Sequence, residues 1–300
     1  MTLPMVVGVD GSEAGLRAAD WAADEAALHG LPLRIVHASL WERYEGPVFT
    51  QSESAEVPPE HALAQDIVGH AAERARQRHT DAEITVDIVP EDAEAALLRE
   101  AHHAAAVVTG CRGRGPITGA LLGSVSRSLA THARCPVIVV RGSPQNRQGA
   151  NGSITVGVGD ATTSTAAIRF AFREAEARRC TLEAVHAWRR PAPKSLKHPL
   201  LAGDPAPRHE DQAATLLEDA LRDPEHEHPD VLVHRVTAEG PVHHVLLTHS
   251  ATADLLVLGA PRRHGPLALP LGRVAHAALQ HADCPVAVVP QREAPPEQPQ

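Results

Sequence analysis

The chain has 300 residues, 43% of them hydrophobic, which is enough for two globular domains with a sizeable core in each. Its net charge of −9 argues against a protein dedicated to binding nucleic acids or anionic membranes. Four widely spaced cysteines without a C-x-x-C pair, and an N-terminus without the features of a secretory leader, predict a reduced, cytoplasmic protein.

Strands and helices alternate along the first half of the chain. Short apolar runs rich in β-branched residues predict strands at 5–10, 33–38, 84–89, 106–109 and 137–140. Helices are expected at 12–29, 61–79, 93–103 and 124–132, with Ser12 as the cap of the first helix and Gly30 at its end. This alternation predicts an α/β fold, a parallel sheet with helices on both faces.

A glycine-rich stretch, residues 110–126, follows the fourth predicted strand. Backbone N–H groups of such a loop and of the following helix start can approach an anion closely. Arg112 and Arg114 add positive charge, and Ser124 and Ser126 add hydroxyl donors that suit phosphate oxygens. The stretch is therefore a candidate phosphate-binding loop, and the alternative is a glycine-rich connection with Ser124 as an ordinary helix cap.

The spacing of the glycines narrows the type of loop. Two residues separate Gly110 from Gly113, and nine separate Gly113 from Gly123, which Ser124 follows. The stretch lacks the lysine of a Walker A loop, and it does not open the first helix as the G-x-G-x-x-G dinucleotide pattern does. Neither of these two common nucleotide motifs therefore describes it.

The second half of the chain repeats the first with an offset of 149 residues. The segment 7–10 aligns with 156–159, and Cys135-Pro136-Val137 aligns with Cys284-Pro285-Val286. We predict one domain at 1–142, a linker at 143–153, a second domain at 154–290 and a disordered tail at 291–300. The proline-rich connection 188–210 of the second copy is expected to be irregular.

The G-x2-G-x9-G-[S/T] spacing resembles the motif of the ATP-binding branch of the universal stress protein family. Gly110, Gly113, Gly123 and Ser124 match every fixed position. The resemblance implies two tandem five-stranded parallel sheets of order 3-2-1-4-5, an adenine nucleotide alpha hydrolase-like fold. It also implies ATP as the ligand, with Mg²⁺ left open, and regulation of an unidentified protein partner in stress adaptation. Two such domains would pair through the last strands, 137–140 and 286–289, with room for a homodimer.

The same resemblance assigns a nucleotide site to the first domain. Strands one and four are neighbours in this order, so Asp10 and the glycine-rich loop would face one crevice. Asp10 matches the acid that holds the adenosine part of ATP, and its alternative role is a helix cap. Gly8 would let the backbone come close beneath the nucleotide, or it would serve tight strand packing. The predicted nucleotide-binding residues are Gly8, Val9, Asp10, Gly11, Ala38, Thr109, Gly110, Cys111, Arg112, Gly113, Arg114, Gly115, Gly123, Ser124, Val125 and Ser126.

The second domain departs from the motif. Gly159 replaces Asp10, Arg262 replaces the second motif glycine, and Arg273 replaces the motif serine. We therefore expect this copy to bind ATP poorly or not at all and to serve as a structural partner, although its arginines could attract another anion. The degenerate second site comprises Gly157, Gly259, Arg262, Gly272 and Arg273.

Catalytic and metal chemistry is not predicted. The twenty histidines lack zinc-site spacing, and no serine nucleophile motif occurs. Two alternatives to a regulatory ATP-binding protein remain. One is a slow ATPase, for which Asp10 is a candidate base, and the other is an interaction module that binds no nucleotide.

Overall fold

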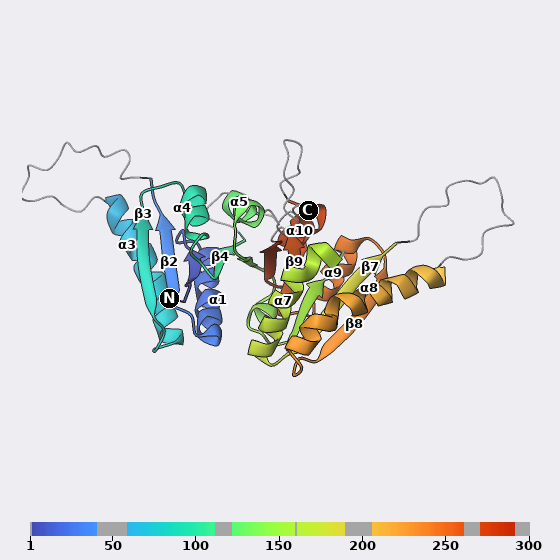
Figure 1. Cartoon of the computed structure of the whole chain (residues 1–300). Helices are drawn as coiled ribbons and strands as arrows, with labels where there is room; N and C mark the ends of the chain where they lie inside the picture. The colour runs from blue at the N-terminus through green and yellow to red at the C-terminus, as the bar shows by residue number, and fades with distance from the viewer. Residues whose placement is uncertain are drawn as a thin grey trace, which may run out of the picture. The chain divides into compact units, whose positions relative to one another are not determined.

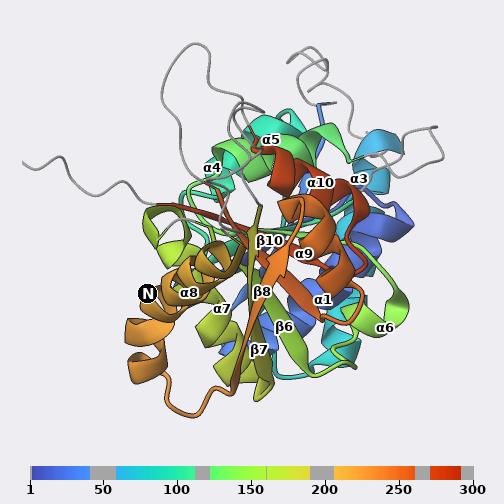
Figure 2. The same cartoon turned by 90° about the vertical axis from the view of Figure 1, so that its right-hand side faces the viewer.

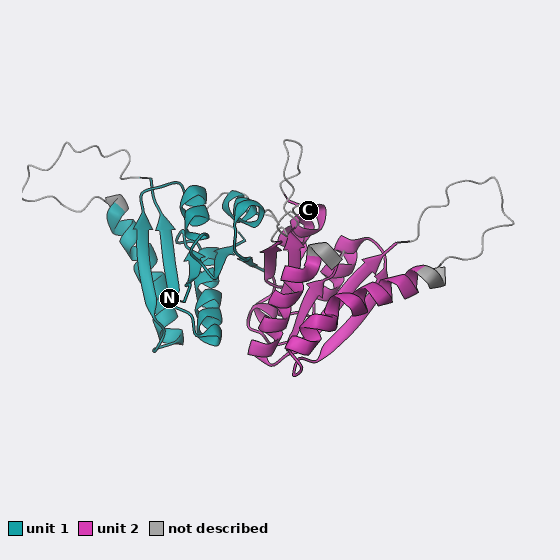
Figure 3. Cartoon of the chain, viewed as in Figure 1, with its two compact units in different colours: residues 1–141 teal, residues 142–300 magenta. Residues whose placement is uncertain are grey.

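A computed structural model describes residues 2–40, 59–111, 122–159, 161–189, 206–260 and 271–291 (Figure 1). The chain divides into two compact units, unit 1 (Met1–Arg141) and unit 2 (Gly142–Gln300), which Figure 3 colours teal and magenta. No helix within the described ranges is both long and apolar enough to span a membrane.

Unit 1 alternates strands with helices. Its elements are β1 (Met5–Gly8), α1 (Glu13–His29), β2 (Leu33–Ala38), α3 (Pro59–Arg78), β3 (Ile84–Val89), α4 (Ala93–Glu100), β4 (Ala106–Gly110), α5 (Ser124–His132) and β5 (Val137–Val140). The strands run parallel in the order β3-β2-β1-β4-β5. Helices α1 and α3 pack together, and so do α4 and α5. The predicted fold class and strand order are confirmed.

Local sequence explains the bounds of α1. The Ser12 Oγ accepts a hydrogen bond from the Gly15 N–H at 3.1 Å, which caps the helix as predicted. Gly30 ends the helix with a φ of 62°, a left-handed conformation that favours glycine. The face of α1 that packs on the sheet is mostly alanine, so the helix can lie close to the small, β-branched core of the strands.

Unit 2 repeats this arrangement. Its elements are α6 (Pro144–Arg147), β6 (Ser153–Gly157), α7 (Ala161–Arg178), β7 (Thr181–Trp188), α8 (Ala206–Glu227), β8 (Val233–Glu239), α9 (Val242–Ser250), β9 (Leu255–Ala260), α10 (Arg273–His281) and β10 (Val286–Pro290). The strand order is β8-β7-β6-β9-β10, again parallel. Helices α7 and α8 pack together, as do α9 and α10, and Figure 2 shows the two pairs on opposite sides of the strands.

The segment predicted as the linker, residues 143–153, packs against the rest of unit 2. Asn146 of α6 is 4% exposed, and its side-chain amide donates to the backbone carbonyls of Ser250, Ala251 and Asp283. The Asp254 carboxylate accepts hydrogen bonds from the backbone N–H groups of residues 151–153. Both ends of this segment are therefore tied to unit 2, a docking that its polar sequence does not reveal.

Several element bounds differ from the sequence expectation, and among them α3 begins at Pro59 rather than at residue 61. Strand β1 ends at Gly8 rather than at residue 10, and α4 ends at Glu100 rather than at 103. Helix α8 begins at Ala206, inside the connection that we expected to be irregular to residue 210. Proline does not prevent this start, because the first helical turn does not require its N–H groups. The predicted tail lies outside the described residues except for Gln291.

Candidate functional site

The carboxyl ends of β1 and β4 lie side by side in unit 1. Val7 of β1 pairs with Val108 of β4, so Asp10 and Cys111 follow the same edge of the sheet. In open parallel sheets, ligands bind at this edge where neighbouring strands lead into opposite faces. Helix α1 follows β1 and helix α5 follows β4, and these belong to the two different helix pairs. The edge between β1 and β4 is therefore the switch point of unit 1.

Asp10 is built into the turn that opens α1. Its Oδ1 accepts hydrogen bonds from the Ser12 N–H at 3.0 Å and from the Ser12 hydroxyl at 2.6 Å. Ser12 in turn caps the helix through Gly15. Gly11 adopts a φ of 75°, so this tight turn requires glycine. The carboxylate is half-buried and bonded to Ser12, which is itself the N-cap of α1, so Asp10 is a fixed acid at the switch point and not the cap of the helix.

Two predicted glycines are explained by packing within unit 1. A Cβ at Gly8 would lie 2.6 Å from Leu97 Cδ1 of α4, and one at Gly110 would lie 2.7 Å from the Ala14 carbonyl of α1. Real Cβ atoms do not approach other atoms so closely. Gly8 thus lets α4 approach β1, which was the alternative role considered from sequence, and Gly110 lets α1 approach β4.

The glycine-rich loop is closed at its base. The Gly123 N–H donates to the Cys111 carbonyl at 3.0 Å, and the Cys111 N–H donates to the Val140 carbonyl at 3.2 Å. The two ends of the loop therefore meet at the end of β4. Arg112, Gly113, Arg114 and Gly115 lie outside the described residues.

Helix α5 starts at this closed base. Gly123 is its N-cap, without a side-chain hydrogen bond to the first turn within the described part of the chain, and Ser124 is exposed. Val125 is half-buried. The first turn of α5 therefore presents backbone N–H groups and one hydroxyl next to the switch point.

Ser126 of α5 and Thr109 of β4 join these two elements through hydrogen bonds, and we call this pair of hydroxyls the clamp. Ser126 is 3% exposed, and its hydroxyl donates to the Gly110 carbonyl at 2.9 Å while it accepts from the Thr109 hydroxyl at 3.2 Å. Its proton therefore goes to the backbone of β4 rather than to a ligand. Thr109, itself 5% exposed, belongs to the same clamp.

Two further predicted residues border this edge. Val9 is 5% exposed and follows β1, and Ala38 is half-buried at the end of β2. His37, which the predicted site did not include, donates from its ring to the Val9 carbonyl. The position of His37 near the end of a predicted strand, at the edge where the site was expected, is the sequence feature that could have indicated it.

The equivalent edge of unit 2 is built differently. Gly159 carries no carboxylate, and its N–H donates to the Ser164 hydroxyl at 2.8 Å. The clamp is replaced by two buried apolar side chains, Leu258 and Ala275. Arg273 is exposed in the first turn of α10, where a positive charge opposes the helix dipole.

The remaining glycines of the degenerate site keep their places. A Cβ at Gly157 would lie 2.9 Å from Leu258 Cδ2, so this glycine serves packing as Gly8 does. Gly259 lies near the end of β9, and Gly272 caps α10. Arg262 lies outside the described residues.

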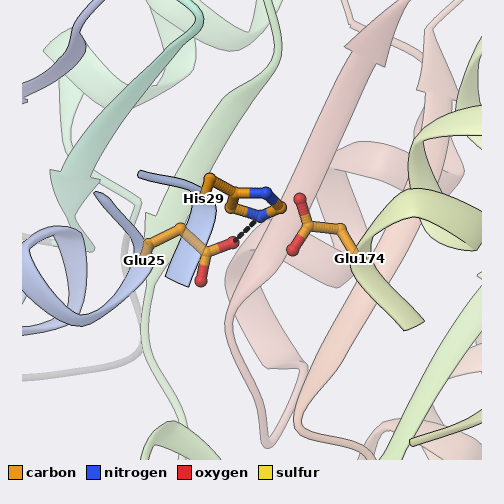
Figure 4. Close-up of side chains that lie close together, drawn as sticks. All are labelled: Glu25, His29 and Glu174. Atoms are coloured by element: carbon orange, nitrogen blue, oxygen red, sulfur yellow. Dashed lines mark ion pairs between the residues drawn. The ribbon is translucent and has the colours of Figure 1, made fainter. Parts of the chain in front are cut away.

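Some histidine and acidic side chains are engaged within their own helices. His29 Nε2 lies 3.5 Å from Glu25 Oε1, one turn earlier in α1 (Figure 4). Glu174, also drawn in Figure 4, belongs to α7 of unit 2 and accepts from Arg178 at 3.5 Å. We assign no metal to these groups, and a protein without a metal stays a prediction.

Comparison with known proteins places this chain. A model of the universal stress protein family matches residues 1–141 and 151–290. Universal stress protein Rv1996 of Mycobacterium tuberculosis is 34% identical over 98% of both chains, and Rv2623 of the same organism is 31% identical over 96% of both.

Solved structures agree on the fold. A universal stress protein from Archaeoglobus fulgidus superposes with a TM-score of 0.67 at 14% identity, covering 96% of this chain and 98% of that one. A functionally unknown protein from Pseudomonas aeruginosa gives a TM-score of 0.63 at 15% identity, covering 97% and 93%. With two tandem copies of the domain and relatives matched over nearly their whole length, the chain belongs to the universal stress protein family.

Proposed function

We propose that unit 1 binds ATP at the switch point between β1 and β4, and that the protein is a nucleotide-dependent regulator in stress adaptation, acting in the cytoplasm. The observation that carries this proposal is the closed base of the glycine-rich loop. Cys111 and Gly123 meet through a hydrogen bond, so both ends of the segment with the G-x2-G-x9-G-[S/T] spacing lie at the edge that Asp10 follows.

The chemical groups at this edge suit the binding of a nucleoside triphosphate. The first turn of α5 offers backbone N–H groups and the exposed Ser124 hydroxyl, and its dipole favours an anion. The loop sequence adds Arg112 and Arg114, whose guanidinium groups suit phosphate oxygens. Asp10, held by Ser12, would accept hydrogen bonds from the adenosine part. Mg²⁺ would accompany the phosphates.

We propose one nucleotide site in each chain. Gly159 offers no carboxylate, and Arg273 places a side chain and a charge in the first turn of α10 where unit 1 has Ser124. Unit 2 would then serve as a structural partner. Pairing of the segments 137–140 and 286–289, a homodimer and a regulated protein partner stay predictions.

We propose regulation rather than turnover. Asp10, the acid at this edge, accepts two hydrogen bonds from Ser12, which tie it to the turn before α1 instead of leaving it to activate water. A slow ATPase would need a base placed beside the phosphates, and the arrangement of Asp10 does not favour that role.

The test is calorimetric titration with ATP, with and without Mg²⁺, of the intact protein, of Gly113→Asp and of the matched control Arg262→Asp. We expect one site per chain that Gly113→Asp abolishes, because a carboxylate there repels phosphate, and that Arg262→Asp leaves unchanged. At a ligand concentration of 100 Kd, ATP should add about 2.7 kcal/mol to the unfolding free energy.

Other outcomes would contradict the proposal in distinct ways. No heat and no thermal shift with ATP, ADP or a cyclic nucleotide would favour the interaction module. Two sites per chain, one of them lost in Arg262→Asp, would mean that unit 2 also binds. Steady phosphate release that disappears in Gly113→Asp would favour the slow ATPase.

A further inference from the structure

Strand β1 leaves the sheet just before the proposed site. Its pairing with β2 ends at Gly8, opposite Val36, and the next N–H, that of Val9, still donates to the Val36 carbonyl at 2.9 Å. The Val9 carbonyl is then bonded by a side chain, because His37 Nδ1 lies 2.8 Å from it. The side chain of β2 thus continues the contact between the two strands by one residue.

This contact fixes the tautomer of His37. A carbonyl oxygen can only accept, so Nδ1 carries the proton and a neutral ring has its acceptor at Nε2. Val9 is 5% exposed, and a backbone carbonyl at a buried residue needs a hydrogen-bond partner. His37 is half-buried at the same edge of the sheet. The imidazole is therefore held in a fixed position by its hydrogen bond and does not rotate freely as a surface group would.

The hydrogen bond of His37 holds the peptide group that directly precedes the acid, Asp10. Asp10 follows Val9 directly, and Gly11 then turns the chain with a positive φ. We propose that His37 is a positioning residue for nucleotide binding: by holding the Val9 carbonyl it sets where β1 ends and where the Asp10 carboxylate lies. This inference rests on the proposed function, because it concerns the affinity of the same site.

The equivalent histidine of unit 2 distinguishes a role in positioning Asp10 from a role in folding alone. His186 Nδ1 lies 2.9 Å from the Val158 carbonyl, which is the same contact at the equivalent positions. The residue that follows Val158 is Gly159, which has no carboxylate to position. Any purely structural contribution of the histidine should therefore be alike in both units, whereas a contribution through Asp10 belongs to unit 1 alone.

The test compares ATP affinity in the full-length variants His37→Ala, His37→Asn and His186→Ala. We expect His37→Ala to weaken ATP binding about tenfold, in line with the loss of one buried hydrogen bond. Asparagine keeps an N–H donor at a similar reach, so His37→Asn should stay within about threefold of wild type. His186→Ala should leave the affinity unchanged.

A double-mutant cycle with Asp10→Asn shows whether His37 acts through the acid. If it does, His37→Ala has little further effect on affinity in the Asp10→Asn background, so the two changes are not additive. Fully additive effects would overturn the proposal, as would wild-type affinity in His37→Ala with only thermal stability reduced. A wild-type protein that binds no nucleotide would instead reject the proposed function, and this inference with it.

Discussion

The two units have the same strand order, but the signs of the charges are exchanged between the helices of the pair α1 and α3 in unit 1 and the pair α7 and α8 in unit 2. In unit 1 the acids lie on α1, where Asp20 and Asp24 each accept two hydrogen bonds from a guanidinium group of α3. In unit 2 the arginine lies on α7, and Arg169 pairs with Glu227 of α8 at 3.4 Å. Arg169 and Glu227 are the sequence equivalents of Asp20 and Arg78.

A second reversal lies on the other face of the sheet. Arg34 of β2 donates to Glu100 of α4 at 2.9 Å, whereas the equivalent residues of unit 2 are Glu183 and His249, 2.9 Å apart. Most apolar core positions, by contrast, keep their character in both units, with exceptions such as Val6, which aligns with the buried Thr155. The comparison teaches that the fold depends on apolar packing and on opposite charges facing each other, and that either helix can carry either sign.

The largest expected effect comes from giving α1 the charge of α7. In Asp20→Arg/Asp24→Arg, four arginines face one another across α1 and α3. We expect a loss of about 3 kcal/mol in unfolding free energy, since each half-exposed pair is worth about 1 kcal/mol and repulsion adds to its loss. Hydrogen exchange of α1 and α3, together with urea unfolding, measures this.

The control restores attraction with the charges of unit 2. Adding Arg74→Asp and Arg78→Glu should recover most of the lost stability, because acids again face arginines. The Asp20 carboxylate raises the pKa of Arg74 chiefly through its hydrogen bond, so the guanidinium group keeps its charge at neutral pH. Equal stability of the double and quadruple variants would show that these charges are only a solvated surface.

An intermediate effect is expected where the units agree. Gly8→Ala and Gly157→Ala each force a Cβ against a leucine, at 2.6 Å and 2.9 Å. We expect each to lower the unfolding free energy by roughly 1–2 kcal/mol, because the leucine ends can move only partly in a packed core. Thermal melts without nucleotide measure it.

Gly69→Ala is the matched control for these glycines. Gly69 is exposed in α3 and has no atom within 4 Å of an added Cβ, so alanine should raise stability by about 0.5–1 kcal/mol. An unchanged melting temperature in Gly8→Ala would return this glycine to a role beneath the nucleotide.

The smallest effect at neutral pH concerns the buried Cys135, which aligns with the equally buried Cys284. Burial raises the pKa of the Cys135 thiol to about 11. Below pH 9 the thiol is neutral in both the folded and the unfolded chain, and it adds no pH dependence. Between pH 9 and 11 only the unfolded chain loses the proton, so unfolding free energy falls by about 1.4 kcal/mol per pH unit.

Denaturant unfolding of wild type and Cys135→Ala across pH 8–11 isolates this slope, which the variant should lack. Alkylation gives a second measure, because the thiolate is the reactive form and Cys135 should react at pH 8 only after unfolding. Rapid modification of Cys135 in the folded protein at that pH would show that its thiol is not shielded as described.

Some elements could be predicted from the sequence because their signals are local. The bounds of β2, β3, α5 and β5 match the expectation, since short apolar runs and a glycine before Ser124 define them. The exchange of Asp10 for Gly159 was likewise visible once the two copies were aligned.

Other features depend on partners that are distant in the sequence. The crowding of Gly8 comes from Leu97 and that of Gly110 from Ala14, contacts that exist only after the helices pack. The hydroxyl of Ser126 was expected to face a ligand, yet it bonds the backbone at Gly110. Just beyond the end of β1, the Val9 carbonyl is bonded by His37 of the next strand, a contact that the apolar pattern of residues 5–10 does not contain.

The reversed helix charges have a consequence for synthesis of a tandem protein. Repeated domains on one chain are prone to exchanging equivalent helices while they fold. If α3 docked on α7, Arg74 and Arg78 would face Arg169 and Arg173, and the like charges would repel. The exchange of α8 onto α1 would set acids against acids in the same way. The charge pattern of each unit therefore favours docking of its own helix during synthesis and disfavours docking of the equivalent helix from the other unit.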